Sequence, residues 1–477
     1  MRQAATAICV RDEVAALPNT AIAYGLKELA RRAGVSSEFF KSWRIEFDDA
    51  EFLKVFVKSG TRKLIRFPRP RGNFKAEIEA RKFRTSTATW LNIADDKAAL
   101  VPSFKIPFSS SEQEEIGPLF LQANEDQIDC SVDLLTSIVL TLGRFEETIP
   151  GPRDEHGRFS VYSSVAWRDK FFHRPIVDEY GLAFREALET FLPGWQAQER
   201  SLKVHIGHDV DEIGTPFSFR TAIAHTIRRG RPMASVRDLA APFTGIETTY
   251  QRSLRQLVKI GKGHGFRPAT YWKAGTAGPH DTGYDPRNKN IRKLMSSFRS
   301  SELELGIHLS YDSYDSLTRF QSEVSTLRDL LGQSKLGGRQ DFLRWNPQTW
   351  VLWDSMNLAY DASVGYADQI GFRAGTCLPF RPWLLSESRE ANLIEVPLTA
   401  MDSALFGYLK LGPDQALSQL LDCVERCRNA GGVFTTVWHN TTMMRPAYIE
   451  TYRKLLGELQ GSETYDWTKS DDGRDWV

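Results

Sequence analysis

The spacing of hydrophobic and polar residues predicts a mixture of helix and strand in the first part of the chain. Residues 19–34 place hydrophobic side chains at helical spacing and end on a glycine, which predicts an amphipathic helix. Three short runs then alternate between hydrophobic and polar residues, and we expect half-buried strands that begin near Trp43, Leu53 and Lys63. These elements predict a smaller α+β N-terminal domain over residues 1–150.

The middle of the chain is predicted to be mainly helical. Hydrophobic periodicity indicates helices over residues 131–147 and 175–192. Between them, residues 148–159 (TIPGPRDEHGRF) are rich in proline, glycine and charge, which is typical of a linker. We therefore expect a helical linker region over residues 151–200.

From about residue 201 the pattern becomes a repeated strand, loop and helix. Predicted strands cover residues 203–207, 269–272, 303–308, 338–343, 393–398 and 433–438. Predicted helices lie between them, at residues 246–261, 314–331, 349–356, 416–429 and 447–458. Such alternation requires a mainly parallel sheet, and we expect an α/β fold with a distorted (β/α) barrel over residues 201–477. In such barrels the chemistry gathers in the loops after the carboxyl ends of the strands.

Composition places the chain among ordinary globular proteins. Of its 477 residues, 41% are hydrophobic and 25% are charged, and 61 basic residues face 60 acidic ones, for a net charge of +1. A chain with this balance is not expected to bind nucleic acid or an anionic membrane through bulk charge. A neutral or zwitterionic ligand such as a sugar chain is compatible with it.

Cysteine usage and hydropathy predict a cytoplasmic protein with no transmembrane segment. The cysteines lack the spacing of a metal site, so we expect reduced thiols that act mostly as packing residues: Cys9, Cys130, Cys377, Cys423 and Cys427. The N-terminal residues MRQAATAICVRDE hold an apolar run that charged residues interrupt, unlike a secretory signal. The most apolar later run, residues 134–142, is well short of the roughly 20 residues that span a bilayer.

The stretch KVHIGHDVD at residues 203–211 begins like a buried strand and ends in two carboxylates, Asp209 and Asp211. Side chains two residues apart point the same way from an extended backbone. Two negative charges so close together are unfavourable unless a cation lies between them or one carboxylate keeps its proton. The pattern therefore suggests either a bound cation or a protonated carboxylate at this strand end.

Other predicted strands also end in polar residues of catalytic type. They are His308 with Asp312, Arg339 with Asp341 and Arg344, and Trp438 with His439 and Asn440. Taken singly, each group also fits an ordinary loop, ion pair or core. Their joint occurrence at strand ends indicates a site, because one histidine, one carboxylate and a second carboxylate or histidine form a common ligand set for a divalent ion.

These residues resemble the motifs of a known enzyme family. The stretches are HDVD at His208, ELGIHLSYDS at Glu304, GGRQDFLR at Gly337, YDAS at Tyr360, GFRAGTCLPFRP at Gly371 and VWHNT at Val437. In this order they resemble the polysaccharide deacetylase family, which is carbohydrate esterase family 4 with its nodulation-protein-B homology domain. Further stretches are similar to the N-terminal region of a bacterial branch found with polysaccharide biosynthesis genes: LLTSIVLTLGRFEE at Leu134, RDEHGRF at Arg153 and RPIVDEY at Arg174. The resemblance thus covers most of the chain.

The resemblance implies a distorted (β/α) barrel that holds one divalent ion, zinc by family, and removes acetyl groups from an N-acetylated sugar polymer or its precursor. By motif position, it implies Asp211 and His308 as metal ligands and Asp209 as the general base. It further implies that Arg339 orients this base and that His439 is the general acid. In such chemistry the ion acidifies a water, a carboxylate takes the proton of that water, and an imidazolium protonates the leaving amine.

The chain departs from the family pattern in three motifs. The second motif normally carries two histidines; here Asp312 takes the second place and is our expected third ligand, with Ser310 or water as alternatives. The third motif lacks the proline after its arginine, and the tryptophan-bearing fourth motif is not recognisable. Tryptophans near strand ends are candidates for stacking on sugar rings, with core packing as the alternative: Trp272, Trp345, Trp383 and Trp438.

Two other functions stay open from the sequence. One is a non-catalytic relative that binds carbohydrate or helps in assembly, which the altered ligand Asp312 favours. The other is a metal-dependent hydrolase of O-acetyl esters or of non-sugar amides. The presence of Asp209, Asp211, His308 and His439 favours an enzyme over the binding protein.

Overall fold

The computed structural model describes residues 17–47, 52–58, 62–69, 84–89, 104–108, 113–213, 247–274, 280–281, 284–442 and 445–469. The predictions about a secretory signal and about Cys9 lie outside these ranges. The cysteines within them, Cys130, Cys377, Cys423 and Cys427, carry free and buried thiols. Among the described residues, no helix combines the length and the hydrophobicity needed to cross a membrane.

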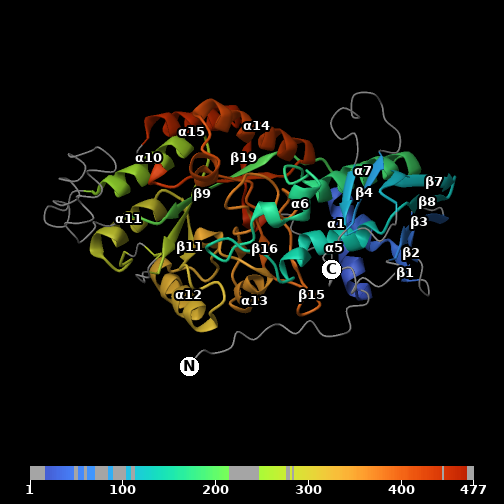
Figure 1. The fold of residues 1–477 in the computed structure, drawn as a ribbon, viewed down its shortest axis with the longest axis horizontal. Coiled ribbons are helices and arrows are strands. Elements are labelled where there is room, and N and C mark those ends of the chain that lie inside the picture. Colours follow the sequence, from blue (N-terminus) through green and yellow to red (C-terminus); the bar gives the residue numbers. More distant parts are fainter. Residues whose placement is uncertain are drawn as a thin grey trace.

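A parallel sheet forms the frame of the C-terminal part, with β9 (Lys203–Val210) near its middle (Figure 1). Its strands run in the order β16-β13-β12-β11-β10-β9-β18-β17, and β19 also pairs with β9. Their bounds are β10 (Ala269–Lys273), β11 (Glu304–Leu309), β12 (Gly338–Gln340), β13 (Tyr360–Asp361), β16 (Ile394–Glu395), β17 (Ala400–Met401), β18 (Val433–Val437) and β19 (Glu463–Thr464). All these neighbours pair in parallel, which confirms the predicted α/β architecture. The path formed by the described strands is open between β16 and β17, so the sheet is a half-barrel rather than a closed barrel.

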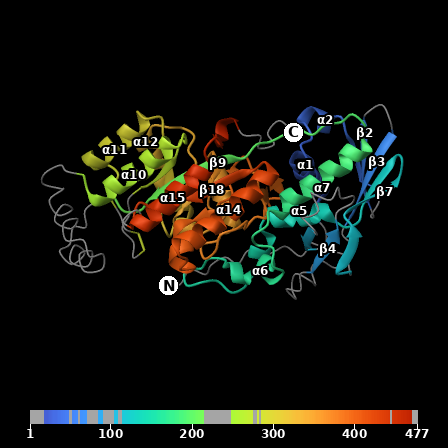
Figure 2. The ribbon, with the colours of Figure 1, turned by 90° about the horizontal axis from the view of Figure 1, so that it is seen from above.

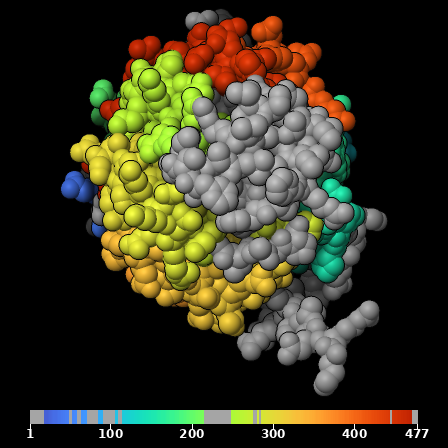
Figure 3. Space-filling view, turned by 90° about the vertical axis from the view of Figure 1, so that its left-hand side faces the viewer, coloured from blue at the N-terminus to red at the C-terminus, as the bar shows by residue number. Residues whose placement is uncertain are grey.

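Helices follow the strands and cover the outside of the sheet, as Figures 1 and 2 show. Their bounds are α10 (Thr249–Gly263), α11 (Lys289–Arg299), α12 (Leu317–Leu331), α13 (Pro347–Ser355), α14 (Pro413–Ala430) and α15 (Pro446–Glu458). Local sequence explains several ends: a capping box of Thr248 and Gln251 starts α10, and Gly431, at φ 60°, ends α14. Figure 3 shows the surface of α10 next to that of the C-terminal helices.

The predicted strand over residues 338–343 ends earlier than expected. β12 stops at Gln340, and Asp341–Leu343 form a 3₁₀ turn. Phe342 and Leu343 have left-handed backbone angles, at φ 56° and 52°, which are uncommon for residues other than glycine. The turn aims the side chain of Asp341 back across the carboxyl end of the sheet.

The N-terminal part contains the expected mixture of helices and strands. Its main helices are α1 (Asn19–Arg32), α5 (Leu134–Leu142) and α7 (Ile176–Phe191), with short helices α2 (Ser37–Lys41) and α6 (Val165–Arg168). One sheet has the order β1-β2-β3-β8-β7 and another the order β5-β4-β6. Their bounds are β1 (Arg44–Phe47), β2 (Phe52–Lys58), β3 (Arg62–Pro68), β4 (Thr85–Thr89), β5 (Phe104–Pro107), β6 (Glu115–Pro118), β7 (Phe120–Asn124) and β8 (Gln127–Cys130). The domain boundaries at residues 150 and 200 stay predictions.

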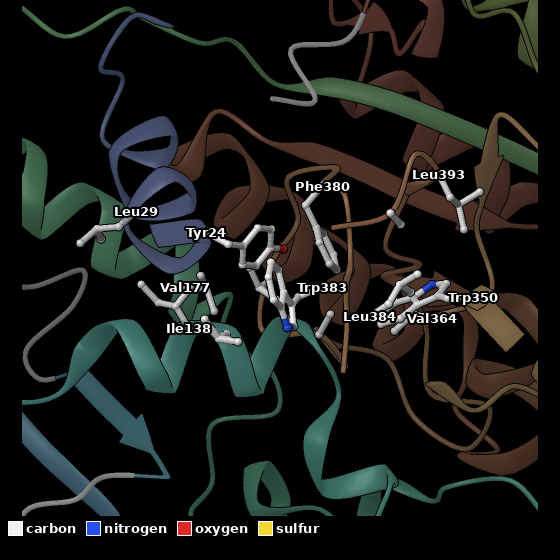
Figure 4. Close-up of a cluster of buried hydrophobic side chains, with 14 of the residues drawn as sticks. Tyr24, Leu29, Ile138, Val177, Trp350, Val364, Phe380, Trp383, Leu384 and Leu393 are labelled. Carbon is white, nitrogen blue, oxygen red and sulfur yellow. The ribbon is translucent and has the colours of Figure 1, made fainter. Parts of the chain in front are cut away.

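One hydrophobic core runs through both parts of the chain. In Figure 4 the ring of Tyr24, on α1, lies beside that of Trp383, with their centroids 5.5 Å apart. Trp383 belongs to the hairpin of β14 (Trp383–Leu384) and β15 (Arg389–Glu390). The Tyr24 hydroxyl donates to the carbonyl of Arg381 (2.8 Å), and Lys27 forms an ion pair with Glu390 (2.5 Å). Helix α1 is therefore packed directly against the hairpin that lies between β13 and β16 in the chain.

Candidate active site

The two aspartates at the end of β9 lie at the centre of the sheet's carboxyl edge but differ in exposure. Asp209 is buried, whereas the side chain of Asp211 is 26% exposed. Asp209 Oδ1 accepts a hydrogen bond from Arg339 Nη1 at 2.7 Å. The first carboxylate is thus held inside the protein by a matched cation, and the second is partly exposed to solvent.

Arg339 reaches Asp209 from β12 along a path that requires a glycine. A Cβ on Gly207 would lie 2.9 Å from the ring of Tyr271 and 3.1 Å from Arg339 Nη1, so a larger residue there would displace the arginine. Arg339 is fully buried, and its Nε donates to the carbonyl of Ala362 at 2.8 Å. Burial lowers the pKa of Arg339, but Asp209, through its charge and its hydrogen bond, together with Tyr271 and Tyr360 raises it more, so the guanidinium stays charged.

Three potential ligand atoms converge beside this pair. They come from Asp211, His308 and Asp341, and they all lie within 4.8 Å of one another. His308 Nε2 lies 3.0 Å from Asp211 Oδ1 and 3.2 Å from Asp341 Oδ1. His308 Nδ1 lies 3.2 Å from the carbonyl of Arg339, which fixes the ring so that Nε2 faces the carboxylates. We call Asp211, His308 and Asp341 the acidic triad.

The structure brings Asp341, rather than the expected Asp312, to His308. The Asp312 side chain is 51% exposed and faces Arg344 at 3.1 Å and Arg319 at 3.6 Å, because the chain turns outward after β11. The alternative ligand Ser310 donates its hydroxyl to Glu323. Placing the third ligand at Asp312 was therefore wrong as a statement of geometry. The sequence held a signal for Asp341, since it lies two residues after Arg339 and such residues share one face of an extended strand.

Lys273 is a further residue of this cluster that the sequence did not single out. It ends β10, and its Nζ lies 2.8 Å from Asp341 Oδ2, 3.5 Å from Asp211 Oδ1 and 3.6 Å from Asp281 Oδ1. Burial lowers the pKa of Lys273, but Asp211 and Asp341 raise it more, which keeps the ammonium charged. The sequence feature that could have identified Lys273 is its position as a charged residue at the end of a hydrophobic strand.

The donor set and its charge fit a divalent cation. Asp211, Asp281 and Asp341 face the ammonium of Lys273, so three carboxylates surround one permanent cation. Burial lowers the pKa of His308, but the neighbouring carboxylates raise it to about 10, so the ring takes up a proton in their field. A divalent ion among the triad atoms would replace that proton and balance the carboxylates, and one imidazole with two carboxylates is a usual set for such an ion.

His439 approaches the two β9 aspartates from the end of β18. Its Nε2 lies 3.9 Å from Asp209 Oδ2 and 3.8 Å from Asp211 Oδ2. On the other side of the ring, Nδ1 lies 2.5 Å from Asp402 Oδ1. Burial lowers the pKa of His439, but Asp402, with smaller contributions from Asp211 and Asp209, raises it to about 9, so the ring is an imidazolium at neutral pH. Sequence analysis missed Asp402, although it follows the short strand β17.

The tryptophans proposed to stack on sugar rings belong to the core. Trp345, Trp383 and Trp438 are buried, and Trp438 is 0% exposed. Trp345 packs against Trp350, with ring centroids 4.5 Å apart, and Trp438 packs against Tyr452, at 4.9 Å. Trp272 is also fully buried. Of the two alternatives that the sequence left open for these tryptophans, stacking on sugar rings and packing in the core, their burial corresponds to core packing.

Two other aromatic side chains are exposed close to the site. Phe342, next to Asp341 in sequence, is 38% exposed, and Tyr408 is 46% exposed. Arg158 joins them, since Nη1 donates to the carbonyl of Phe342 (2.9 Å) and Nη2 to the hydroxyl of Tyr408 (2.7 Å). Arg158 belongs to residues 148–159, the expected linker, which therefore contacts the site. We call Phe342 and Tyr408 the aromatic pair.

Comparisons with known proteins give a family for part of the chain and distant structural likenesses. Residues 17–193 match the model of a family described as one of unknown function, DUF7033. No curated protein matches the chain. The solved structures that are similar to it include a candidate polysaccharide deacetylase from Mycobacterium smegmatis, with 14% identity, a TM-score of 0.39, and coverage of 56% of this chain and 87% of that one. They also include the allantoinase PuuE, with 13% identity, a TM-score of 0.40, and coverage of 60% and 91%.

A third similar structure is a polysaccharide deacetylase candidate from Pseudomonas aeruginosa PAO1. It has 13% identity and a TM-score of 0.40, and the match covers 58% of this chain and 91% of that one. Structures described as polysaccharide deacetylases are thus among those similar to this chain, as the sequence motifs led us to expect. Because the likenesses are distant, function is inferred from the side chains of the site.

Proposed function

We propose that the protein is a metal-dependent hydrolase that removes N-acetyl groups from an N-acetylated sugar polymer or its precursor, in polysaccharide biosynthesis or modification. The observation that carries this proposal is the position of Asp209 and His439 beside the acidic triad, with His439 Nε2 3.9 Å from Asp209 Oδ2 and 3.8 Å from Asp211 Oδ2. A buried carboxylate, an imidazolium and a ligand set in one place are the groups that amide hydrolysis requires. They come from the ends of β9, β11, β12 and β18.

The acidic triad would hold the ion, and zinc is the metal we propose. When bound, such an ion acidifies a water and polarises the carbonyl of the amide. Lys273 donates to Asp341 Oδ2 and leaves Oδ1 directed at His308 Nε2. Each ligand is thus oriented by a second contact within the protein, which favours binding of an ion in a fixed position.

Asp209 is proposed as the general base. Arg339 holds one of its oxygens at 2.7 Å, and the other oxygen, Oδ2, lies on the side of His439. This oxygen accepts the proton of the attacking water, while the arginine keeps the carboxylate in a single orientation. The ammonium and guanidinium groups of the site also favour the negative charge that develops on the carbonyl oxygen.

His439 is proposed as the general acid. Its Nδ1 is bound to Asp402, so the proton on Nε2 is the one available for transfer. The leaving nitrogen of an amide is a poor leaving group until it is protonated, and Nε2 supplies that proton as the bond to the acyl carbon breaks. The products are acetate and the free amine of the sugar.

A sugar substrate is supported by the aromatic pair. Exposed aromatic rings beside polar groups are typical of sites that bind sugar rings by stacking. Phe342 lies in the 3₁₀ turn after β12 and Tyr408 at the end of a short π-helix (Ala404–Tyr408). Both accept hydrogen bonds from the guanidinium of Arg158, which itself pairs with Asp154 at 2.7 Å. Phe342 directly follows the triad residue Asp341 in the chain, so the pair includes an immediate neighbour of the acidic triad.

Release of acetate tests this proposal. Purified protein would be freed of metal with a chelator, reloaded with Zn²⁺, and incubated with N-acetylated glycans, with O-acetylated glycans and with a small non-sugar amide. We expect zinc-dependent acetate release from the N-acetylated glycan. Release from the ester or the small amide alone would show that the site hydrolyses a different bond, and no release from any of them would contradict the enzyme.

One observation favours a second candidate, a carbohydrate-binding protein without activity. The ammonium of Lys273 already lies among the carboxylates that would hold the ion. If this cation takes the place of the metal, the protein would bind sugar without hydrolysing it. Metal content after reloading separates the two: one equivalent of zinc per chain supports the hydrolase, and none supports the binding protein.

A further inference from the structure

Lys273 is a buried lysine at the centre of the acidic cluster. As the last residue of β10, it pairs in register with His308 of β11. Its backbone N–H donates to the hydroxyl of Tyr284 at 2.9 Å, and its side chain is only 5% exposed. Strand pairing and burial therefore fix the ammonium beside the acidic triad.

The two oxygens of Asp341 divide between this ammonium and the triad. Oδ2 accepts from Lys273 at 2.8 Å, whereas Oδ1 faces His308 Nε2 at 3.2 Å. An ion held by Oδ1 would share the carboxylate with Lys273. Two cations on one buried carboxylate repel each other strongly, because little water screens them.

The same ammonium has the opposite effect when no ion is bound. It faces Asp211, Asp281 and Asp341 at 3.6 Å or less. Without the ammonium, the three carboxylates would lie close together with less positive charge to neutralise them. Burying negative charge without a matching positive charge costs free energy, so the metal-free protein would be less stable. Lys273 thus favours the metal-free site and disfavours the occupied one.

We propose that Lys273 is a positioning residue that limits the affinity of the acidic triad for its divalent ion and stabilises the protein while the ion is absent. The inference rests on the proposed metal site. This role differs from that of an ordinary buried ion pair. Loss of an ordinary pair lowers the stability of the protein and leaves its affinity for a metal ion unchanged, whereas loss of Lys273 should also increase that affinity.

The test is a Zn²⁺ titration of the full-length Lys273→Met variant. Methionine keeps the length of the side chain and removes its charge. We expect the Kd for Zn²⁺, measured by calorimetry on chelator-treated protein, to fall about tenfold. We also expect the metal-free variant to melt about 5 °C below the metal-free wild type.

Two further variants make the result interpretable. Lys27→Met removes another buried ion pair, with Glu390, far from the triad in sequence, and is expected to lower the melting temperature with an unchanged Kd. Lys273→Gln keeps a hydrogen-bond donor for Asp341 but loses the charge, so it is also expected to bind Zn²⁺ more tightly. Lys273→Gln decides the question if Lys273→Met does not fold.

The outcomes separate this inference from the proposed function. Wild type that binds Zn²⁺, with an equal or weaker affinity in the folded Lys273 variants, overturns the role of Lys273 alone. Wild type that binds no Zn²⁺, with binding in Lys273→Met, supports the role of Lys273 and overturns the proposed hydrolase. Absence of binding in every variant overturns both.

Discussion

His439 is bound to Asp402 at two points. The ring Nδ1 lies 2.5 Å from Asp402 Oδ1, and the backbone N–H of His439 donates to Asp402 Oδ2 at 2.9 Å. Asp402 is buried, so this carboxylate fixes both the position and the protonation of the ring without contact to solvent. The consequence is an Nε2 that carries a proton and faces the aspartates of β9.

This pair predicts the pH dependence of activity. Burial lowers the pKa of His439, but Asp402, with smaller contributions from Asp211 and Asp209, raises it to about 9, so a general acid at this position loses its proton, and activity falls, as the pH rises through about 9. In Asp402→Asn the largest of these raising charges is gone, and we expect the alkaline limb of kcat/KM to move down by about one pH unit or more. A pH profile of acetate release measures this shift. Asp129→Asn, which breaks a surface pair with Arg66, is a control that should leave the profile in place.

The third ligand is tested by a matched pair of aspartate variants. Asp341→Asn removes the oxygen that faces His308, and we expect the affinity for Zn²⁺ to fall about 100-fold or more. Asp312→Asn changes an exposed side chain that faces Arg344, so its Kd should stay within about twofold of wild type. Calorimetric titration of both variants decides between them. A loss of affinity in Asp312→Asn only would restore the ligand first expected from sequence.

If Asp209 is the general base, its loss should lower activity without changing the amount of metal that the protein binds. Asp209→Asn keeps the acidic triad but removes the carboxylate that takes the proton of the water, and we expect kcat to fall by about 10²–10⁴-fold. Zinc content, measured by atomic absorption, should stay at the wild-type value. An unchanged kcat would exclude Asp209 as the base, and a lost metal would make it a ligand instead.

The aromatic pair is distinguished from the buried tryptophans by its effect on binding rather than on stability. Phe342→Ala removes a partly exposed ring, so we expect a higher KM for a glycan, by about 5–30-fold for the loss of about 1–2 kcal/mol of stacking, with little change in melting temperature. Trp345→Ala empties a buried site and is expected to lower stability by about 3–5 kcal/mol. Kinetics with a glycan and denaturant unfolding measure the two effects. An unchanged KM in Phe342→Ala would remove the pair from the proposed sugar site.

Much of the fold was predictable because it depends on local pattern. β9, β10, β11 and β18 lie where hydrophobic runs predicted strands, and most helices between them begin and end within a few residues of the expected positions. The shorter β12 was not predictable in the same way. Its last predicted residues adopt left-handed angles, which hydrophobic spacing does not encode.

The candidate site, like the fold, was predictable from the sequence only in part. The sequence by itself determined that Asp209, His308, Arg339 and His439 stand at strand ends, because hydrophobic periodicity locates those ends and parallel strands bring them to one edge. Only the tertiary structure decided that Asp341 rather than Asp312 faces His308, that Lys273 and Asp402 join the cluster, and that the tryptophans are buried. These contacts depend on how loops turn after the strands and on which strands are neighbours, and both are set by packing between residues far apart in the sequence.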